Sequence, residues 1–447
     1  MNSLTSLFSP RSVALIGAAH TEIKLGGVVL KNLLKLRGKV YPVNPKYDEL
    51  MGLKAYHTVK DIPASIDLAI IMRPAPEVPE ILKELNGRAK TAIVVSSGFA
   101  EVGEEGLQAE VKRMGRESGI RLLGPNCMGI FNPGSRLDTF FISPERMKRP
   151  KRGNVAILSQ SGAIMASLFE TLRTSHIGVS KAVGYGNALD IDESDLYEYL
   201  LLDKKTDVVV SYIESLGDGR RFIEKAKELS GRKSLIILKS GKGESGSAAA
   251  YSHTGRLAGR YDVFRSILRQ FGIMEAGDFD ETMDATKALS YQRPSMGNRV
   301  CIITNGGGSA VLAADECMRQ GLNVARLAEE KLTRLKDMFP HFYVLNNPFD
   351  LTAQVRDEDY LTVLDEVKDD YDGFLIIALP NVIGITERLA ELMKDFKGRM
   401  QKPVVFHIPV DGISRRIIAR LEKTLIPVFP SPERAVKGLR ALLRQGK

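Results

Sequence analysis

Short apolar runs alternate with helix-like stretches through the first third of the chain. The runs at residues 12–16, 39–43 and 92–96 are rich in apolar and β-branched residues, and residues 26–37 have the apolar spacing of a helix. Strands that are apolar along their length and separated by helices predict a parallel sheet with helices on both faces. Ligands of such sheets bind beyond the carboxyl ends of the strands, so we expect the functional residues in the turns at that edge.

The remaining two thirds of the chain contain an internal repeat. The segment GNVAILSQSG at 153–162 recurs as GNRVCIITNGG at 297–307, and two later strands of the first copy recur in the same order in the second. A chain of 447 residues is also too long for one hydrophobic core. We therefore predict an α/β protein in which a first doubly wound domain precedes two copies of another α/β domain. The expected domain bounds are 1–145, 150–291 and 296–447.

One histidine stands in a loop that is suited to chemistry. His253 lies in the segment YSHTGRLAG, after an expected strand at 234–238 and a loop at 239–250 rich in glycine, serine and lysine. A neutral imidazole is a nucleophile near pH 7, and on such a loop it can reach an anion and accept a phosphoryl group. A lone histidine is more often a core or capping residue, but this loop favours the functional interpretation. The second copy lacks the loop, which suggests that one copy does the chemistry while the other is structural or supports an interface.

A second turn of small residues lies upstream, between the apolar run 155–158 and a helix-like stretch at 164–171. A strand, a small-residue turn and a helix together point free backbone N–H groups and the positive end of the helix dipole at an anion. The sequence therefore predicts a phosphate-binding site at Ser159, Ser161 and Gly162, with an ordinary helix N-cap as the alternative.

The turn after the first strand, GAAH at 17–20, has only part of the G-x-G-x-x-G fingerprint of dinucleotide-binding folds. No acidic residue ends the second strand, where NPK stands at 44–46. A cation at this position suits a phosphorylated nucleotide better than NAD, which weakens the interpretation as an oxidoreductase. Lys24 could also neutralise a phosphate, with a solvated lysine at the start of a helix as the alternative, and we expect His20 to be a surface turn residue.

Composition argues against several other classes of protein. The net charge of +9 is spread along the chain except at 146–152, which we expect to be a linker, and tryptophan is absent. Nucleic acid is therefore not expected as a partner. No apolar run approaches the roughly 20 residues that span a bilayer, and the sequence shows no export signal or metal-ligand cluster. The three cysteines are irregularly spaced, so we expect reduced thiols in a cytoplasmic protein.

Motifs along the whole chain resemble the α chain of the ADP-forming (NDP-forming) acyl-CoA synthetases, the acetate–CoA ligase family related to succinyl-CoA synthetase. The most specific of them is SHTG at 252–255. The other motifs that carry the resemblance are IGA at 16–18, YPVNPK at 41–46, SSGFAE at 96–101, GPNCMG at 124–129 and SQSG at 159–162. The resemblance implies a Rossmann-like CoA-binding domain followed by two flavodoxin-like domains of the succinyl-CoA-synthetase type.

The resemblance also implies residue roles. His253 would carry the phosphoryl group between an acyl phosphate and a nucleotide, and Glu214 would orient its imidazole; a helix-capping role for Glu214 is the alternative. We expect Cys127 to be a thiol packed near the thioester rather than a nucleophile. Arg73 departs from the Val-Pro-Ala usual in the family, and could contact a CoA phosphate or merely sit at the rim. The expected CoA-binding residues are Gly17, Ala18, Lys24, Asn44, Lys46, Arg73, Ser97, Gly98, Phe99 and Asn126.

The expected reaction is acyl-CoA + ADP + phosphate ⇌ carboxylic acid + ATP + CoA, through acyl phosphate and phosphohistidine. The sequence contains neither a Walker A motif nor a segment resembling the ATP-grasp fold. In the family that fold holds Mg²⁺ and ADP or ATP, on a fused segment or a separate β chain. We therefore expect an ATP-grasp β subunit in a cytoplasmic α2β2 heterotetramer. The alternative function is a non-catalytic CoA-binding regulatory module. The sequence leaves open the acyl group (acetyl, branched, aryl or succinyl) and the preference for ADP or GDP.

Overall fold

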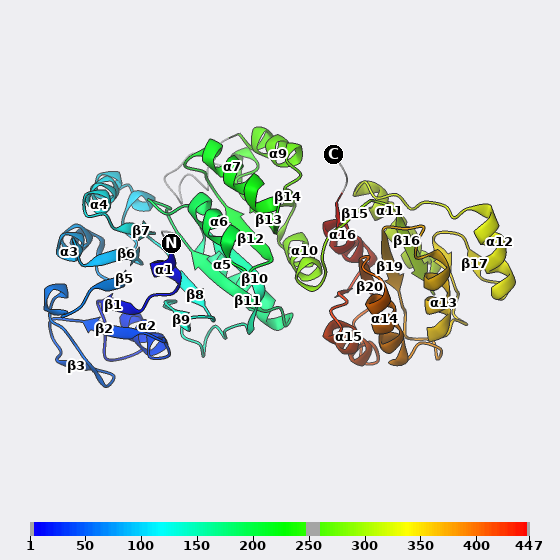
Figure 1. Ribbon diagram of the computed structural model, residues 1–447, viewed down its shortest axis with the longest axis horizontal. Helices are drawn as coiled ribbons and strands as arrows, with labels where there is room; N and C mark the ends of the chain where they lie inside the picture. Colours follow the sequence, from blue (N-terminus) through cyan, green and yellow to red (C-terminus); the bar gives the residue numbers. More distant parts are fainter. Residues whose placement is uncertain (1–3, 247–259, 445–447) are drawn as a thin grey trace. The chain divides into compact units, whose positions relative to one another are not determined.

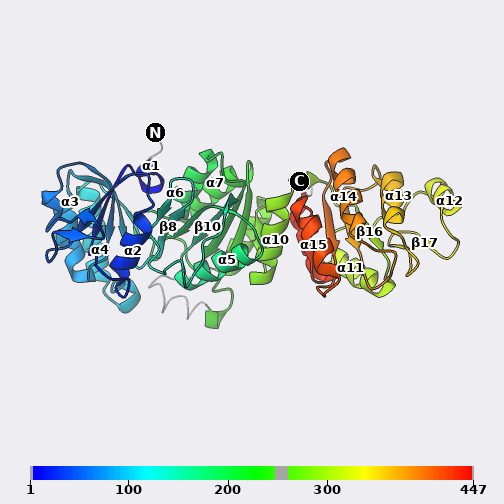
Figure 2. The ribbon, with the colours of Figure 1, turned by 90° about the horizontal axis from the view of Figure 1, so that it is seen from below.

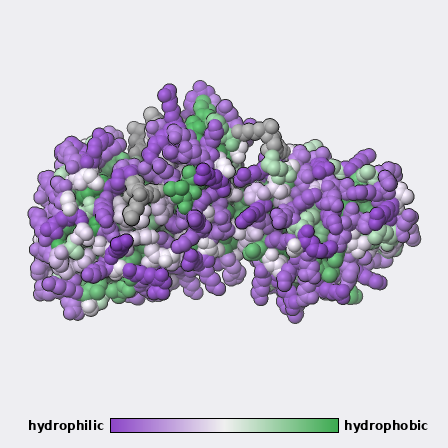
Figure 3. Space-filling model, viewed as in Figure 1, coloured by the Kyte–Doolittle hydropathy of each residue, from purple (hydrophilic) through white to green (hydrophobic). Residues whose placement is uncertain are grey.

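The computed structural model describes residues 4–246 and 260–444. By its internal contacts the chain divides into two compact units, Met1–Ala276 and Gly277–Lys447. The first unit contains two large sheets and the second contains one (Figures 1 and 2). No helix in the described ranges is long and apolar enough to cross a membrane. The face drawn in Figure 3 is mainly hydrophilic, with apolar residues scattered over it.

The first sheet has five parallel strands in the order β2-β1-β5-β6-β7. Val13 and Leu15 of β1 pack with α2 residues such as Leu30, whereas Ala14 and Ile16 pack in a second cluster with α3 and α4. Helices therefore cover both faces of the sheet, as its apolar strands predict. The elements of this part are α1 (Thr5–Phe8), β1 (Ser12–Ile16), α2 (Leu25–Leu33), β2 (Lys39–Val43), β3 (Glu49–Leu50), β4 (Leu53–Lys54), β5 (Ile66–Ile71), α3 (Val78–Leu85), β6 (Ala89–Val94), α4 (Glu105–Glu117) and β7 (Arg121–Leu123).

The second sheet has the order β14-β13-β12-β10-β11-β8-β9. β8 follows β7 along the chain and pairs antiparallel with β11, with Ile130 opposite Val183. The segment predicted as the first domain therefore contributes two strands to the sheet of the second, and one apolar cluster joins α2, β8 and β12. The elements are β8 (Gly129–Asn132), β9 (Leu137–Asp138), β10 (Arg152–Ser159), α5 (Gly162–Thr174), β11 (Val179–Gly184), α6 (Glu193–Leu202), β12 (Val208–Ile213), α7 (Gly219–Ser230), β13 (Ser234–Lys239), α9 (Tyr261–Gln270) and β14 (Met274–Ala276).

The second unit has a six-stranded sheet in the order β17-β18-β16-β19-β20-β21, in which only β17 is antiparallel to its neighbour. Its elements are α10 (Phe279–Tyr291), β15 (Ser295–Met296), β16 (Val300–Thr304), α11 (Gly307–Arg319), α12 (Glu329–Met338), β17 (Val344–Leu345), β18 (Phe349–Asp350), α13 (Asp357–Val367), β19 (Gly373–Ile377), α14 (Arg388–Arg399), β20 (Val404–His407), α15 (Ser414–Lys423), β21 (Val428–Phe429), α16 (Pro432–Leu442) and β22 (Leu443–Arg444).

The internal repeat appears in the structure as a recurring amide contact. Gln160, after β10, accepts hydrogen bonds from the backbone N–H groups of Glu214 and Ser215, which follow β12. Asn305, after β16, accepts one from the N–H of Leu379, beyond β19, and donates one to its carbonyl oxygen. In both copies the amide joins the turn before a helix to the end of the neighbouring strand.

Helix α10 packs against a helix from the C-terminal end of the chain. Residues 279–289 are expected to close the second domain, but α10 lies in the second compact unit and packs against α16. Arg434 of α16 forms an ion pair with the buried Asp284 of α10, with 2.7 Å between Nη2 and Oδ1. The three domain bounds stay a prediction, and the boundary between the compact units falls ahead of α10.

Candidate active site

The first sheet has its topological switch point between β1 and β5, because the chain continues from β1 to β2 on one side and later to β5 on the other. Gly17 ends β1 with a φ of +93°, and a Cβ atom there would lie 2.5 Å from the carbonyl oxygen of Met72. At Gly26, in the first turn of α2, a Cβ atom would lie 2.0 Å from the oxygen of Gly17. Only glycine permits both approaches. Two strand ends and a helix N-terminus therefore meet at the point where such sheets bind ligands.

A cavity of about 910 Å³ opens at this point. Its volume lies at the upper end of the range for small-molecule sites. Turns after all five strands of the first sheet contribute to its lining, and so does the turn between β10 and α5 in the second sheet. The predicted site residues that line it are Gly17, Ala18, Lys24, Asn44, Arg73, Ser97, Asn126, Ser161 and Gly162. Those outside the lining are Lys46, Gly98, Phe99, Ser159 and Glu214, and His253 lies outside the described residues.

The charged side chains near the first sheet differ in how they are paired. The guanidinium of Arg73 donates to both carboxylate oxygens of Glu77, at 2.8 and 3.0 Å, so its charge is already compensated. Lys24 lines the cavity and makes no ion pair within the described part of the chain. Asn44 donates through Nδ2 to the oxygen of Ala18 at 2.7 Å, and its Oδ1 accepts the N–H of Lys46 at 2.9 Å. Lys24 is therefore the cation best placed to meet an anionic ligand here.

The predicted phosphate turn is built by its serines. Ser159 is fully buried and its Oγ donates to the oxygen of Ser161 at 2.7 Å. Ser161 caps α5, because its Oγ accepts the N–H of Ile164 at 3.4 Å. Ser159 thus stabilises the turn through this hydrogen bond without lining the cavity. Ser161 and Gly162 line the cavity at the N-terminus of a 13-residue helix. This end of the helix favours an anion.

Glu214 lies beside the base of the histidine loop. It follows β12 and is buried, and Ser240, the first residue after β13, donates its N–H to the oxygen of Ile213 at 3.1 Å. Lys239 ends β13, and its Nζ donates to the oxygen of Glu214 at 2.6 Å. Burial lowers the pKa of Lys239 to about 8. His253 itself lies outside the described residues, so its expected pairing with Glu214 stays a prediction.

Cys127 lines the cavity as a neutral thiol. It is buried, its Sγ donates to the oxygen of Val94 at 3.3 Å, and burial raises its pKa to about 12. Because the thiolate is the reactive form, we expect iodoacetamide at pH 8 to leave Cys127 unmodified in the folded chain. Intact-mass and peptide mass spectrometry would measure this, with alkylation in 6 M urea as the control. Stoichiometric labelling of folded protein at Cys127 would contradict the neutral-thiol assignment.

Several cavity residues were not predicted from the sequence. His20 is exposed, as expected of a surface turn residue, and it also lines the cavity together with Tyr47; their ring centroids are 6.4 Å apart. Gln160 and Met128 lie inside motifs quoted above, but no motif role marks them. Phe141 follows β9 in a segment with no motif at all. The only sequence signal for Gln160 and Met128 is that they lie inside the SQSG and GPNCMG motifs.

Two family models match the chain. A CoA binding domain matches residues 11–133, which include every turn of the first sheet that lines the cavity. A succinyl-CoA ligase like flavodoxin domain matches residues 152–289, which include the phosphate turn, Glu214 and His253.

Similarity to individual proteins extends over nearly the whole chain. The chain is 38% identical to the acetate–CoA ligase [ADP-forming] II subunit alpha of Pyrococcus furiosus, covering 99% of this chain and 98% of that one. It is also 38% identical to an acetate–CoA ligase [ADP-forming] of Methanocaldococcus jannaschii, but covers only 62% of that longer protein. Among solved structures, the dinucleotide forming acetyl-coenzyme A synthetase 1 of Ca. Korarchaeum cryptofilum, in complex with phosphate and ADP, superposes with a TM-score of 0.91. That chain is 35% identical, with 99% of this chain and 96% of that one covered.

Proposed function

Because the chain belongs to the ADP-forming acetate–CoA ligase family, we propose that it is the α subunit of an ADP-forming acyl-CoA synthetase. Together with a partner chain, it converts acyl-CoA, ADP and phosphate into carboxylic acid, ATP and CoA, reversibly. One observation carries the proposal: a single cavity joins the switch point of the first sheet to the anion-binding end of α5. A thioester and a phosphate ion could therefore meet in it.

The reaction is divided into three transfers. A phosphate oxygen bonds to the thioester carbonyl carbon as the C–S bond breaks, which gives an acyl phosphate and the CoA thiolate. An imidazole nitrogen of His253 then bonds to phosphorus as the P–O bond to the acyl group breaks, and the carboxylate leaves. Finally a β-phosphate oxygen of ADP takes the phosphoryl group as the N–P bond breaks. Each transfer needs positioning and charge neutralisation more than acid–base catalysis.

The residues around the cavity fit CoA. Lys24 supplies a cation for the phosphates, and Asn44 holds the turns after β1 and β2 together. Met72 and Val95 give the cavity an apolar wall that suits an uncharged pantetheine arm. Glu214, at the base of the loop, would orient the His253 imidazole and stabilise its positively charged form.

The partner is an ATP-grasp β subunit that holds Mg²⁺ and ADP, in a cytoplasmic α2β2 assembly. Two observations support a partner. The Pyrococcus furiosus relative is named as a subunit alpha. The Methanocaldococcus jannaschii relative extends well beyond the part that this chain covers. The alternative of a non-catalytic CoA-binding module is disfavoured, because the similarity to ligases runs through both sheets of the first unit and through the second unit.

The test is to incubate the chain and its β partner with ATP labelled at the γ-phosphate. We expect an acid-labile, base-stable label on this chain, which is the signature of a phosphoramidate. Glu214→Gln keeps the size of the side chain and removes its charge, so we expect slower labelling. Absence of label in active enzyme, or a base-labile label only, would contradict the phosphohistidine step.

Binding of CoA is expected to depend on Lys24 more than on Lys46, because only Lys24 lines the cavity. Lys24→Glu replaces an attraction with a repulsion beside an anionic ligand, so we expect a loss of affinity of about tenfold or more. Lys46→Glu is the matched charge reversal, with an expected loss below about threefold. Isothermal calorimetry with CoA at two salt concentrations would measure both, since added salt should shrink the difference. Equal losses would remove Lys24 from the site.

A further inference from the structure

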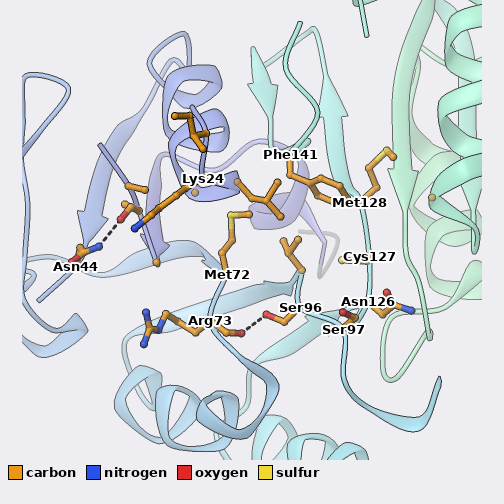
Figure 4. Close-up of a pocket in the computed structure, with 18 of the residues that line it drawn as sticks. Lys24, Asn44, Met72, Arg73, Ser96, Ser97, Asn126, Cys127, Met128 and Phe141 are labelled. Carbon is orange, nitrogen blue, oxygen red and sulfur yellow. Dashed lines mark hydrogen bonds between the residues drawn. The ribbon is translucent and has the colours of Figure 1, made fainter. Parts of the chain in front are cut away.

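The backbone after β12 is held by a side-chain amide from the phosphate turn. Oε1 of Gln160 accepts the N–H groups of Glu214 and Ser215 at 2.5 and 3.0 Å, and its Nε2 donates to the oxygen of Ser215 at 2.8 Å. Gln160 also lines the cavity that Figure 4 shows in close-up. The backbone of Glu214 is therefore tied to the turn at which we expect phosphate to bind.

A buried lysine holds the same backbone from the strand on the other side of β12. Lys239 ends β13, where it pairs with Ile213 of β12, and it is 5% exposed. Its Nζ donates to the oxygen of Glu214 at 2.6 Å and to the oxygen of Ser240. The ring centroid of Phe264, from α9, lies 5.9 Å from this Nζ. The lysine thus joins the first residue after β12 to the first residue after β13.

The internal repeat supplies a comparison for these two contacts. In the second copy the amide of Asn305 contacts Leu379, which therefore corresponds to Glu214. By the registers of the two sheets, the residue that corresponds to Lys239 is Ile408, which is fully buried. The copy without the histidine loop thus keeps the amide contact and has apolar residues in place of both charged ones. Because a buried ammonium is costly and the fold forms without it, we relate the lysine to the chemistry.

The charge of this lysine depends on its surroundings. Burial lowers the pKa of Lys239 to about 8. Among the described residues, Glu214 and Glu275 of β14 favour its charged form, and Lys242 opposes it. At pH 7 the side chain is therefore mainly an ammonium, and its charge strengthens the hydrogen bonds to the two carbonyl oxygens. An apolar side chain of similar length would leave both oxygens without this donor.

We propose that Lys239 is a positioning residue that holds Glu214 in place for the phosphoryl transfers. The inference rests on the proposed function, in which the Glu214 carboxylate orients the imidazole of His253. Gln160 and Lys239 hold the backbone of Glu214 from the two strands beside β12, so its position is set relative to the phosphate turn. Lys239 does not itself react in this scheme and acts only through Glu214.

The test follows the rate at which the assembled α and β chains take up label from ATP labelled at the γ-phosphate. Lys239→Met keeps the length of the side chain and removes its charge and its donors, so we expect labelling to slow by about tenfold or more. In a Glu214→Ala background, which lacks the positioned group, the same substitution should slow labelling by less than about threefold. Binding of CoA should stay within about twofold of normal. Equal losses in the two backgrounds would overturn the inference.

The dependence of labelling on pH separates the ammonium from a merely structural contact. Because the ammonium loses its proton as the pH rises, labelling by the unchanged chain should fall by about fivefold between roughly pH 8 and pH 9.5. Lys239→Arg keeps a charged donor in this range, so we expect the fall to disappear. Lys397, in the second unit, is the matched control: burial lowers its pKa to about 8, and its Nζ donates to the oxygens of Thr424 and Leu425. Lys397→Met and Lys397→Arg should change neither the rate nor its dependence on pH.

Normal labelling of Lys239→Met would overturn the inference. So would an unchanged alkaline fall in a Lys239→Arg protein that unfolds at the normal temperature. If Lys239→Arg does not fold, Lys239→Met and its comparison in the Glu214→Ala background decide alone. If the unchanged chain takes up no acid-labile label, the proposed function fails and the inference fails with it.

Discussion

Replacing His253 with alanine is expected to abolish ATP formation from acyl-CoA in the assembled enzyme while CoA binding stays within about twofold of normal. The imidazole is the proposed acceptor of the phosphoryl group, and a methyl group cannot form the N–P bond. The cavity that would hold CoA is lined by turns of the first sheet and by the turn at 160–163, so the substitution leaves its described walls intact. Loss of turnover without loss of binding separates a reacting group from a binding group.

The measurement is a coupled assay of ATP formation together with calorimetry of CoA. His341→Ala, at an exposed position in the second unit, is the matched control and should retain full activity. A single-step exchange assay adds a further check, since release of CoA from acyl-CoA and phosphate should persist in His253→Ala. If the variant turns over at the normal rate, the phosphohistidine mechanism is wrong.

Much of the fold was predictable because its strands are apolar along their whole length. β1, β2, β6, β10 and β13 appear where their β-branched runs stand. β8 was not predicted, because its four residues, GIFN, are too few to show a pattern of apolar and polar residues. Its partner β11 lies about 50 residues further along the chain. The consequence is practical: a fragment that ends near residue 145 would carry β8 and β9 without the sheet to which they pair.

The packing partner of α10 could not be predicted from the sequence. An amphipathic pattern predicts that a helix has a buried face, but not the surface against which that face packs. Asp284 is 3% exposed and pairs with Arg434, 150 residues away, which no local pattern indicates. The helix therefore packs within the second compact unit, while the succinyl-CoA ligase like flavodoxin domain model matches residues as far as 289, so the predicted bound at 291 stays a prediction.

The candidate site was predicted at the level of turns rather than side chains. Parallel strands bring their carboxyl ends to one edge, so motifs there predict a shared cavity. The pattern does not tell where each side chain points. Phe99, expected to contact CoA, is fully buried in the apolar cluster of the first sheet, and Lys46 lies outside the lining. Conversely, Phe141 reaches the cavity because Phe140 is anchored, and that anchoring depends on contacts distant in sequence.

The purified chain without its partner is expected to form no ATP from acyl-CoA, ADP and phosphate. In the proposed mechanism the phosphoryl group on His253 needs a bound nucleotide as acceptor, and phosphoryl transfer to a nucleotide depends on a metal ion that neutralises its phosphates. In the proposed assembly the nucleotide and the metal ion are both held by an ATP-grasp β chain. The solved relative from Ca. Korarchaeum cryptofilum is described as a complex with phosphate and ADP.

Adding the β chain and Mg²⁺ should therefore raise the rate of ATP formation at least about a thousandfold over that of the chain alone, and EDTA should abolish this activity again.

The first step of the reaction, measured alone, separates the roles of the two chains more clearly. Because the cavity proposed for the thioester is lined by residues of the first unit of this chain, cleavage of acyl-CoA by phosphate is expected at a low rate even without the partner. ATP formation should therefore depend on the β chain, whereas cleavage of acyl-CoA should persist at a low rate without it. If the partner were needed only to stabilise the structure of this chain, both activities would respond to it in the same way. Robust ATP formation by the chain alone, in a preparation that mass spectrometry shows to be free of other proteins, would refute the division of labour between two chains.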